Sequence, residues 1–251
     1  MSQAAERVGH ASRTARKASA SENRDGTQHQ LMTLRADVAR YAKKMHDSGL
    51  VRATQGNLSA RDLKSGLICV TPSGAEYDSL GAEDIVVVTA DGELVEGRWN
   101  PSVEVPAHLA VYRRRTDVGC VMHTHSIYAT VFGTLYRPFP MILAESAYCL
   151  GGEVPIAPYL ESGTSEFGEM VANYLASGSA VIWGNHGAMA VGRTVAQAYS
   201  IAHALEDSAR VYWLASQVGQ PRALPEEEVL RLHASWLASY GQRPLNSPDE
   251  P

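Results

Sequence analysis

The sequence predicts a single α/β domain in which helices cover a central sheet. The 251-residue chain is 45% hydrophobic and 20% charged, which is ordinary usage for a folded globular protein. Short apolar runs bounded by Gly, Pro and Asp-Gly turns alternate with longer segments that carry apolar residues at helical spacing. No internal repeat and no linker-like stretch divides the chain, so we expect one hydrophobic core.

Charge, cysteine content and hydropathy exclude several classes of protein. The 22 Lys and Arg residues against 27 Asp and Glu residues give a formal net charge of −5, so nucleic acid is not an expected partner. Cys69, Cys120 and Cys149 are widely spaced and form no CxxC pair, which favours reduced thiols in the cytoplasm. No apolar run approaches the ~18 residues of a membrane span, so no membrane partner is expected either.

The two ends of the chain differ in composition from the rest. Residues 1–29 are rich in Ala, Ser, Arg and Gln and are predicted to be a disordered tail. The Arg-rich, acid-poor start also resembles an organelle transit peptide, although it lacks the apolar core of a secretion signal. Residues 244–251 are polar and Pro-rich and are predicted to be a second disordered tail. The folded domain is therefore expected over residues 30–243.

The first half of the domain reads as one helix followed by short strands. Apolar residues at helical spacing predict a helix over about 30–48. Apolar runs predict strands over 67–71, 85–89 and 94–97, and Asp91-Gly92 is a strong hairpin dipeptide between the last two. The helical stripe consists of Leu31, Leu34, Val38, Tyr41, Ala42 and Met45.

The second half alternates between helices and buried strands. Thr194 is a good N-cap for a long amphipathic helix over 195–218. Pro225, followed by three glutamates, predicts the start of a last helix that extends to about Tyr240. The other predicted elements are a helix over 103–114, a strand over 119–124, a helix over 127–133 and strands over 180–183 and 188–191.

Three histidines form the sharpest chemical feature of the sequence. His123 and His125 are two apart on a predicted strand, so their side chains share one face and start roughly 7 Å apart. Two imidazoles can converge from there on one metal ion, although a half-exposed strand could carry two histidines for no such reason. His186 lies in a Gly-containing turn between two apolar strands. Three histidines with an open fourth position are typical of a catalytic metal.

One carboxylate and two turns complete the candidate site. Glu104 begins a predicted helix and could transfer a proton beside the metal, although a first-turn glutamate also simply stabilises a helix. The turns Thr54-Gln55-Gly56-Asn57 and Thr71-Pro72-Ser73-Gly74 could hold an anion through backbone N–H groups. Each turn alone is more often an ordinary chain reversal, and neither matches a nucleotide-binding fingerprint.

The order of these motifs resembles the class II aldolase/adducin family over about residues 31–243. The resemblance implies an α/β/α fold around a mostly antiparallel central sheet, assembled as a homotetramer with active sites between subunits. The motifs that carry it are Gly56-Asn57, Thr71-Pro72-Ser73-Gly74, Pro101-Ser102-Val103-Glu104, His123-Thr124-His125, Asn185-His186-Gly187 and Tyr240-Gly241.

The resemblance to the aldolases of this family also implies a reaction. A ketose 1-phosphate would be cleaved to dihydroxyacetone phosphate and an aldehyde through an enediolate that a divalent metal stabilises. The metal, Zn²⁺ or another ion such as Mn²⁺ or Co²⁺, would bind His123, His125 and His186. Glu104 and Tyr240 would act in proton transfer. The residues that match the phosphate-binding positions are Gly56, Asn57, Ser73, Gly74 and Ser102.

The sequence departs from the aldolase pattern at two positions. Val103 stands where the family often has a second serine, which removes one hydroxyl from the phosphate site. Glu145 stands near the place of a tyrosine that a neighbouring subunit supplies, and family dehydratases carry a catalytic glutamate in this segment. A decarboxylase or a sugar-phosphate dehydratase that uses Glu145 is therefore the alternative. Family epimerases have Asp at the position of Glu104. An adducin-like scaffold is a remote alternative, because a scaffold does not need the metal ligands.

Overall fold

A central sheet of eight strands organises the computed structural model, which describes residues 28–239. The strand order is β4-β3-β2-β1-β5-β8-β7-β6, and every neighbouring pair is antiparallel except β6 and β7. The predicted mostly antiparallel sheet is therefore confirmed. The strands are β1 (Asn57–Arg61), β2 (Ile68–Val70), β3 (Val86–Val88), β4 (Leu94–Glu96), β5 (Cys120–Thr124), β6 (Ile156–Ala157), β7 (Ala180–Trp183) and β8 (Gly187–Gly192).

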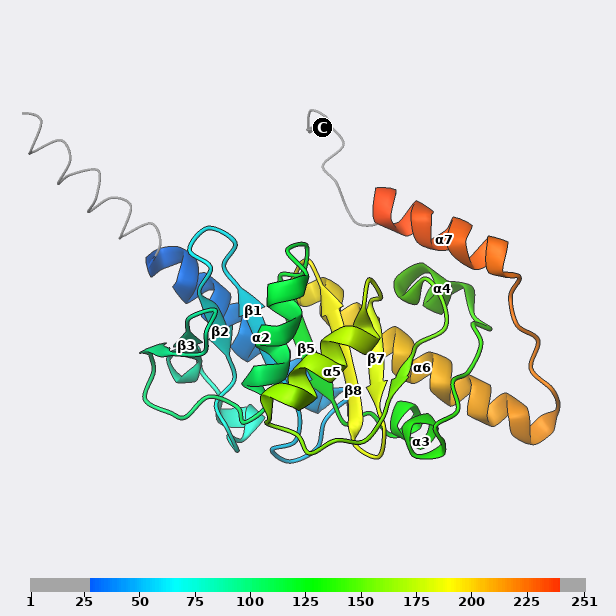
Figure 1. Ribbon diagram of the computed structural model, residues 1–251, viewed down its shortest axis with the longest axis horizontal. Coiled ribbons are helices and arrows are strands. Elements are labelled where there is room, and N and C mark those ends of the chain that lie inside the picture. Colours follow the sequence, from blue (N-terminus) through cyan, green and yellow to red (C-terminus); the bar gives the residue numbers. More distant parts are fainter. Residues whose placement is uncertain (1–27, 240–251) are drawn as a thin grey trace, which may run out of the picture.

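Helices cover both faces of the sheet, which gives the expected three-layer α/β/α arrangement (Figure 1). One face packs against α2 (Val105–Arg114) and α5 (Ser165–Leu175). The other face packs against the first helix, which spans 28–47 in the described part of the chain, and against α3 (Ile127–Leu135) and α6 (Val195–Val218). Outside this layer, α4 (Ala144–Leu150) packs on α6, and α7 (Glu226–Ser239) packs on α4. Two 3-10 turns occupy Tyr77–Ser79 and Ala82–Asp84.

Strand alternation decides which side chains face α2 and α5. In β5, Cys120 and Met122 lie in the core under the long helix α6, whereas Val121 lies in the core under α2 and α5. His123 follows in the same alternation and therefore shares the face of Val121. The same rule places Asn57 of β1 and Trp183 of β7 on this face.

Most predicted elements are present with shifts of one or two residues at their ends. The helix over 195–218 has the predicted bounds, and the Thr194 hydroxyl accepts the N–H of Gln197 as its cap. The Asp91-Gly92 turn joins β3 to β4 as predicted, with Gly92 at φ +90°. Tyr240 and both predicted tails lie outside the described residues, apart from residues 28 and 29 of the first tail, which are helical.

Four elements were not predicted, and β1 explains why most clearly. Its sequence Asn-Leu-Ser-Ala-Arg looks too polar for a central strand. Hydrogen bonds satisfy the buried Ser59 hydroxyl, which lies 2.7 Å from His108 Nδ1 and 2.9 Å from the Tyr112 hydroxyl. The other unpredicted elements are α4, β6 and α5. Among residues 28–239, no helix is both long enough and apolar enough to cross a membrane.

Candidate metal centre

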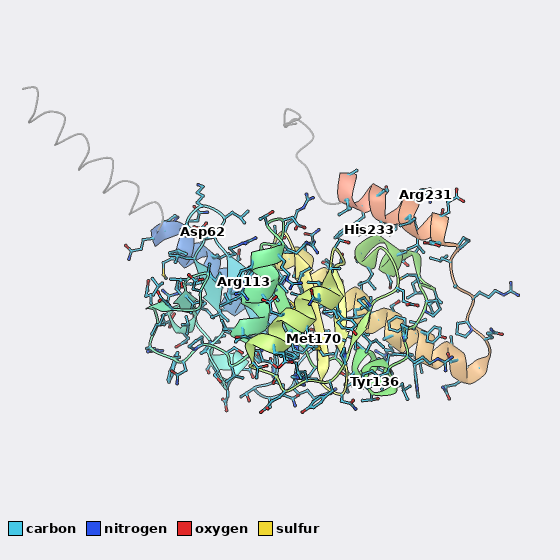
Figure 2. The ribbon with its side chains drawn as sticks, in the orientation of Figure 1. Asp62, Arg113, Tyr136, Met170, Arg231 and His233 are labelled. Carbon is cyan, nitrogen blue, oxygen red and sulfur yellow. The ribbon has the colours of Figure 1, made fainter. Side chains whose placement is uncertain are left out.

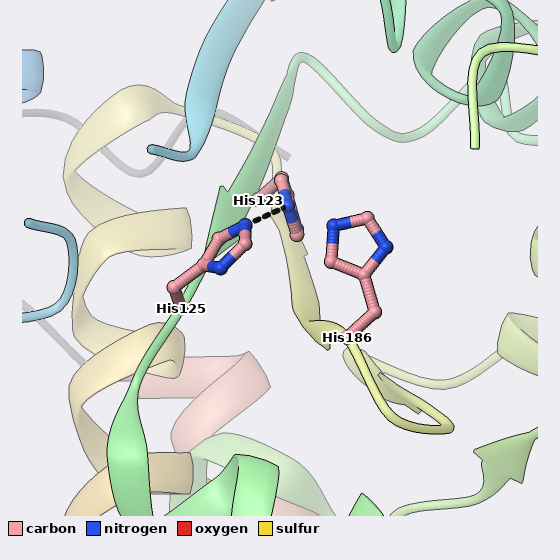
Figure 3. Close-up of side chains that lie close together, drawn as sticks. All are labelled: His123, His125 and His186. Carbon is pink, nitrogen blue, oxygen red and sulfur yellow. Dashed lines mark hydrogen bonds between the residues drawn. The ribbon is translucent and has the colours of Figure 1, made fainter. Parts of the chain in front are cut away.

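Three histidines converge where β5 and the β7–β8 hairpin come together (Figure 3). The centroids of their rings lie 4.8–5.0 Å apart, and His123 Nε2 lies 3.0 Å from His125 Nε2. One ring nitrogen of each histidine lies within 4.8 Å of the others. The structure thus brings together His123 and His125, whose spacing predicts a shared face, and His186, which the sequence places in a turn.

The backbone fixes each histidine in a different way. His123 Nδ1 lies 2.9 Å from the Ala188 carbonyl oxygen, so Nδ1 carries the proton and Nε2 offers its lone pair. The backbone N–H of His125 donates to the backbone carbonyl of Leu50. His186 follows Asn185, whose φ of +57° turns the chain tightly. A side chain on Gly187 would lie 3.0 Å from the His123 ring, so the glycine allows the hairpin to approach β5.

Burial keeps these imidazoles uncharged. It lowers the pKa of His123 well below the usual value, and the neighbouring His125 and His186 lower it further. Burial also lowers the pKa of His125 and of His186, while Glu104 opposes both shifts. Neutral histidines are the form that ligates metals. We therefore read the short contacts between Glu104 and these rings as contacts with neutral imidazole.

Glu104 lies against the same group of histidines. It precedes the first residue of α2, and its carboxylate oxygens lie 3.3 Å from His123 Nε2 and 3.3 Å from His186 Nε2. Asn57 Nδ2 donates to Oε2 of Glu104 at 2.6 Å. The carboxylate is only 6% exposed. A buried carboxylate is therefore held beside two neutral histidine nitrogens, those of His123 and His186.

This donor set fits a divalent cation. Neutral imidazole nitrogens with a nearby carboxylate suit Zn²⁺, and Mn²⁺ and Co²⁺ also accept such ligands. Nε2 of His123 is buried, and its contacts among the described residues are with His125 and Glu104. The two positive charges of an ion would neutralise Glu104 in a site where water is largely excluded.

Different contacts connect the two candidate phosphate turns, at Asn57 and at Ser73-Gly74, to the residues of the histidine cluster. Asn57 pairs with His123 across β1 and β5, and its amide nitrogen is committed to Glu104. Ser73 and Gly74 are exposed in the turn after β2. The Ser102 N–H donates to Thr71 O, which joins that turn to the segment that leads into Glu104. The structure therefore places Asn57 as a partner of Glu104 and leaves the hydroxyl of Ser73 open to solvent.

A cavity of about 380 Å³ borders the Ser73-Gly74 turn. Its lining includes Arg98 and Trp99, neither of which the sequence analysis singled out. The Asp84 carboxylate accepts from both side chains, and these bonds lower the pKa of Asp84 to about 2. An arginine thus lies close to the turn that is predicted to receive an anion.

The structure does not bring Glu145 to the histidines within one subunit. Glu145 is exposed on α4, which packs against α6 and α7. His233 of α7 bonds the Tyr148 carbonyl of α4 at the upper edge of the molecule in Figure 2. Tyr136, whose hydroxyl lies against Gly184 in the hairpin that carries His186, is at the lower edge. Tyr240 lies outside the described residues.

Aromatic rings that the sequence analysis did not select surround the histidines. The Trp183 ring stacks on the His123 ring with centroids 4.1 Å apart and an interplanar angle of 14°. Phe167 of α5 meets Trp183 edge-on at 4.8 Å. Strand alternation is the signal that could have identified Trp183, because Trp183 pairs with Gly187 across β7 and β8 on the face of the histidines.

Comparison with known proteins places this geometry in a family. Residues 36–213 match the family described as Class II Aldolase and Adducin N-terminal domain. The 5-deoxy-D-ribulose 1-phosphate aldolase of Bacillus thuringiensis serovar kurstaki is 35% identical over 209 residues, which cover 83% of this chain and 97% of that protein. The L-ribulose-5-phosphate 4-epimerase of Salmonella paratyphi B is 32% identical, with 85% of this chain and 97% of that protein covered.

A solved structure gives the same result for the fold. The chain named L-fuculose 1-phosphate aldolase superposes with a TM-score of 0.78 at 33% identity, and the match covers 82% of this chain and 96% of that chain. Sequence and fold agree over nearly the whole described region. The chain therefore belongs to the class II aldolase and adducin family.

Proposed function

We propose that this protein is a metal-dependent aldolase that cleaves a ketose 1-phosphate to dihydroxyacetone phosphate and an aldehyde. The observation that carries the proposal is the Glu104 carboxylate, which lies 3.3 Å from two ligand-type histidine nitrogens and is oriented by Asn57. A proton-transfer group is thus fixed beside the cation site. The class II aldolase homologues support the same reaction type.

Each residue has a distinct role in this proposal. Bound Zn²⁺, Mn²⁺ or Co²⁺ would act as a Lewis acid that stabilises the negative charge of the enediolate. Glu104 would hold or deliver the proton at the enediolate carbon, because its carboxylate is the acid nearest the histidines. Ser73, Gly74 and Ser102 would bind the phosphate with hydroxyl and N–H groups. Gly56 supports the site indirectly, since a side chain there would strike Val51 and the His123 carbonyl.

The rim of the site favours a substrate with an apolar far end. Val103, which precedes Glu104, is 67% exposed, and Ile127, two residues after His125, is 43% exposed. Tyr159 is also exposed, and its N–H donates to the Tyr136 hydroxyl beside the His186 hairpin. Exposed apolar side chains of this kind suit a deoxy sugar better than a fully hydroxylated one. The 5-deoxyribulose aldolase relative is consistent with this choice.

The quaternary and cellular setting is part of the same proposal. We propose a cytoplasmic homotetramer in which residues 30–243 form the catalytic domain and Tyr240 assists proton transfer. The three cysteines of the described region are free thiols, as a reducing compartment requires. The second half of α6 exposes Trp213, Leu214 and Val218, which provides apolar surface for subunit contact.

The alternative reactions lack a matching observation. A dehydratase or decarboxylase that uses Glu145 would need this side chain at the metal, but within one subunit Glu145 is exposed on α4, which packs against α6 and α7, so only the Glu145 of a neighbouring subunit could serve. An adducin-like scaffold would have no use for three neutral histidines around a buried carboxylate. The aldolase is therefore the function that we propose to test.

The test is a cleavage assay on metal-loaded protein. The panel is 5-deoxyribulose, fuculose, rhamnulose and methylthioribulose 1-phosphates, with dihydroxyacetone phosphate as the readout. We expect release from the 5-deoxy substrate and a loss of about 10²–10⁴-fold in the Glu104→Gln variant. Glu145→Gln is the matched carboxylate control and should retain activity, whereas a loss as large as that of Glu104→Gln would favour the alternative that uses Glu145. No release from any ketose phosphate by protein that binds metal would refute the aldolase proposal.

A further inference from the structure

The centre of the site contains an indole ring for which the proposed reaction has no chemical use. Trp183 ends β7, is 1% exposed and carries no charge. Its ring nevertheless lies closer to a candidate metal ligand than any other aromatic ring described between residues 28 and 239, with 4.1 Å between the centroids of Trp183 and His123. It also meets the His186 ring at 5.2 Å and 72°. One side chain therefore touches two of the three ligand histidines.

The contacts are made by the ring faces and edges rather than by the indole N–H. Trp183 Nε1 is buried and has no hydrogen-bond partner among the described residues. A buried donor without a partner is unfavourable, and Phe or Leu would avoid that cost. The contribution of the tryptophan must then come from its wide flat face. Phe167 supports that face from α5, edge-on at 4.8 Å, and also lies 6.3 Å from the His186 ring.

This stack completes the restraint of His123. The bond from Nδ1 to the Ala188 carbonyl fixes which nitrogen is protonated, but a single hydrogen bond leaves the ring free to rock about its axis. A parallel neighbour at 14° removes that freedom. It also favours the metal-bound state, because a ligated imidazole loses electron density and an electron-poor ring is attracted to an indole face.

We propose that Trp183 is a positioning residue of the metal centre that orients His123 and His186 and raises the affinity of the site for a divalent cation. The proposal rests on the metal site of the proposed function but not on its substrate or reaction. It also makes Trp183 a built-in optical reporter. An excited indole stacked on an imidazole that has lost electron density should lose emission when the metal binds.

The experiment measures Zn²⁺ and Co²⁺ binding to metal-free protein, with the metal ions alone as probes. We expect the Kd for Co²⁺ to rise about tenfold or more in Trp183→Leu and by a smaller factor in Trp183→Phe, because phenylalanine restores part of the stacking face. Zn²⁺ should quench part of the tryptophan emission of the unchanged protein. The quenching should vanish in Trp183→Phe.

Trp236→Phe is the matched control. Trp236 lies on α7, where its ring stacks on that of His233, which is not one of the three ligand histidines, at 6.0 Å and 22°, so this variant should keep both the affinity and the quenching. If Trp183→Leu does not fold, Trp183→Phe still provides both readouts. Wild-type affinity in Trp183→Phe and Trp183→Leu, or quenching that persists without Trp183, would overturn the proposal. Normal metal binding without any aldolase activity would leave it standing and refute the proposed reaction alone, whereas no metal binding at all would overturn both.

Discussion

Two clusters of ligand-type side chains between residues 28 and 239 each bring three donor atoms within reach of a single metal ion. His123, His125 and His186 form one, and His46, Asp47 and Asp78 form the other, each with donor atoms within 4.8 Å. They differ in what surrounds them. The histidine cluster is largely buried, whereas both aspartates of the second cluster are exposed.

The two clusters also differ in the charged groups that lie next to them. In the surface cluster, the Lys43 ammonium lies 2.7 Å from Asp78 Oδ1 and 3.6 Å from Asp47 Oδ1, so this side chain already balances the negative charge of the carboxylates. At the buried cluster, the ion pairs of residues 28–239 bring in one charged group, the Glu104 carboxylate, which a metal ion would neutralise. Proximity of donor atoms is therefore a weak criterion. Burial, protonation state and uncompensated negative charge make the difference.

The largest effect should come from removing one ligand of each cluster. His186→Ala leaves two histidines, too few for a tight site, so we expect metal affinity and aldolase activity to fall by about 10³-fold or more. His46→Ala should leave both unchanged. Co²⁺ titration with the cleavage assay measures this, and an equal loss in the two variants would erase the distinction between the clusters.

The next effect concerns the residue that holds Glu104. Asn57→Ala removes the 2.6 Å hydrogen bond to the buried carboxylate. A hydrogen bond to a charged group is worth about 1.5–3 kcal/mol, so kcat should fall about 10- to 100-fold. Metal affinity should change little, because the histidines remain. A rise in KM for the phosphate substrate with normal kcat would instead assign Asn57 to the phosphate, as its sequence motif suggests.

A third effect tests burial through pH. Burial, together with the nearby His123, lowers the pKa of His108 to about 3, so the folded protein keeps this ring neutral where the unfolded chain protonates it. The unfolded chain thus binds the extra proton below about pH 6.5, and stability falls as the pH falls through that window toward about 3.

The measurement is urea unfolding of metal-free protein from about pH 7.5 to about pH 5.5. The unchanged protein should lose about 1.4 kcal/mol more unfolding free energy over this range than His108→Gln. His46→Gln, which changes a half-exposed histidine, provides the comparison. Identical pH slopes for the unchanged protein and His108→Gln would contradict the neutral, buried state of His108.

The smallest effect should be at the surface cluster itself. Asp78→Asn removes the partner of Lys43 on an exposed face, where ion pairs contribute little to stability. We expect the urea midpoint, the Co²⁺ titration and the activity to stay unchanged within error. Loss of a Co²⁺ equivalent in this variant would reveal a second metal site and break the comparison.

The sequence predicted the elements with a clear period and the residues on them. The long helix over 195–218 was predicted with its cap because one strong N-cap and a long apolar stripe coincide. His123 and His125 were paired because strand alternation alone puts them on one face. These predictions depend only on neighbours along the chain.

The remaining features depend on contacts between distant segments. The polar strand β1 was missed because Ser59 becomes tolerable only when His108 and Tyr112 are beside it. The hydrogen bond from Asn57 to Glu104 joins residues 47 positions apart, and no local sequence pattern predicts it. Trp183 ends a predicted strand, but its contact with His123 depends on how β7 pairs with β8 and β8 with β5, which no local pattern predicts.

The position of β5 between β1 and β8 has a consequence for how the protein matures. A chain emerging from the ribosome offers His123 and His125 long before His186 and the β8 carbonyl that orients His123. Long-range strand pairing is slow to form, so tight binding at the proposed metal site would require a sheet that is already complete. An ion that binds only the finished sheet stabilises it over every unfinished form. Cells short of that metal should therefore degrade the protein faster, even though its synthesis is unchanged.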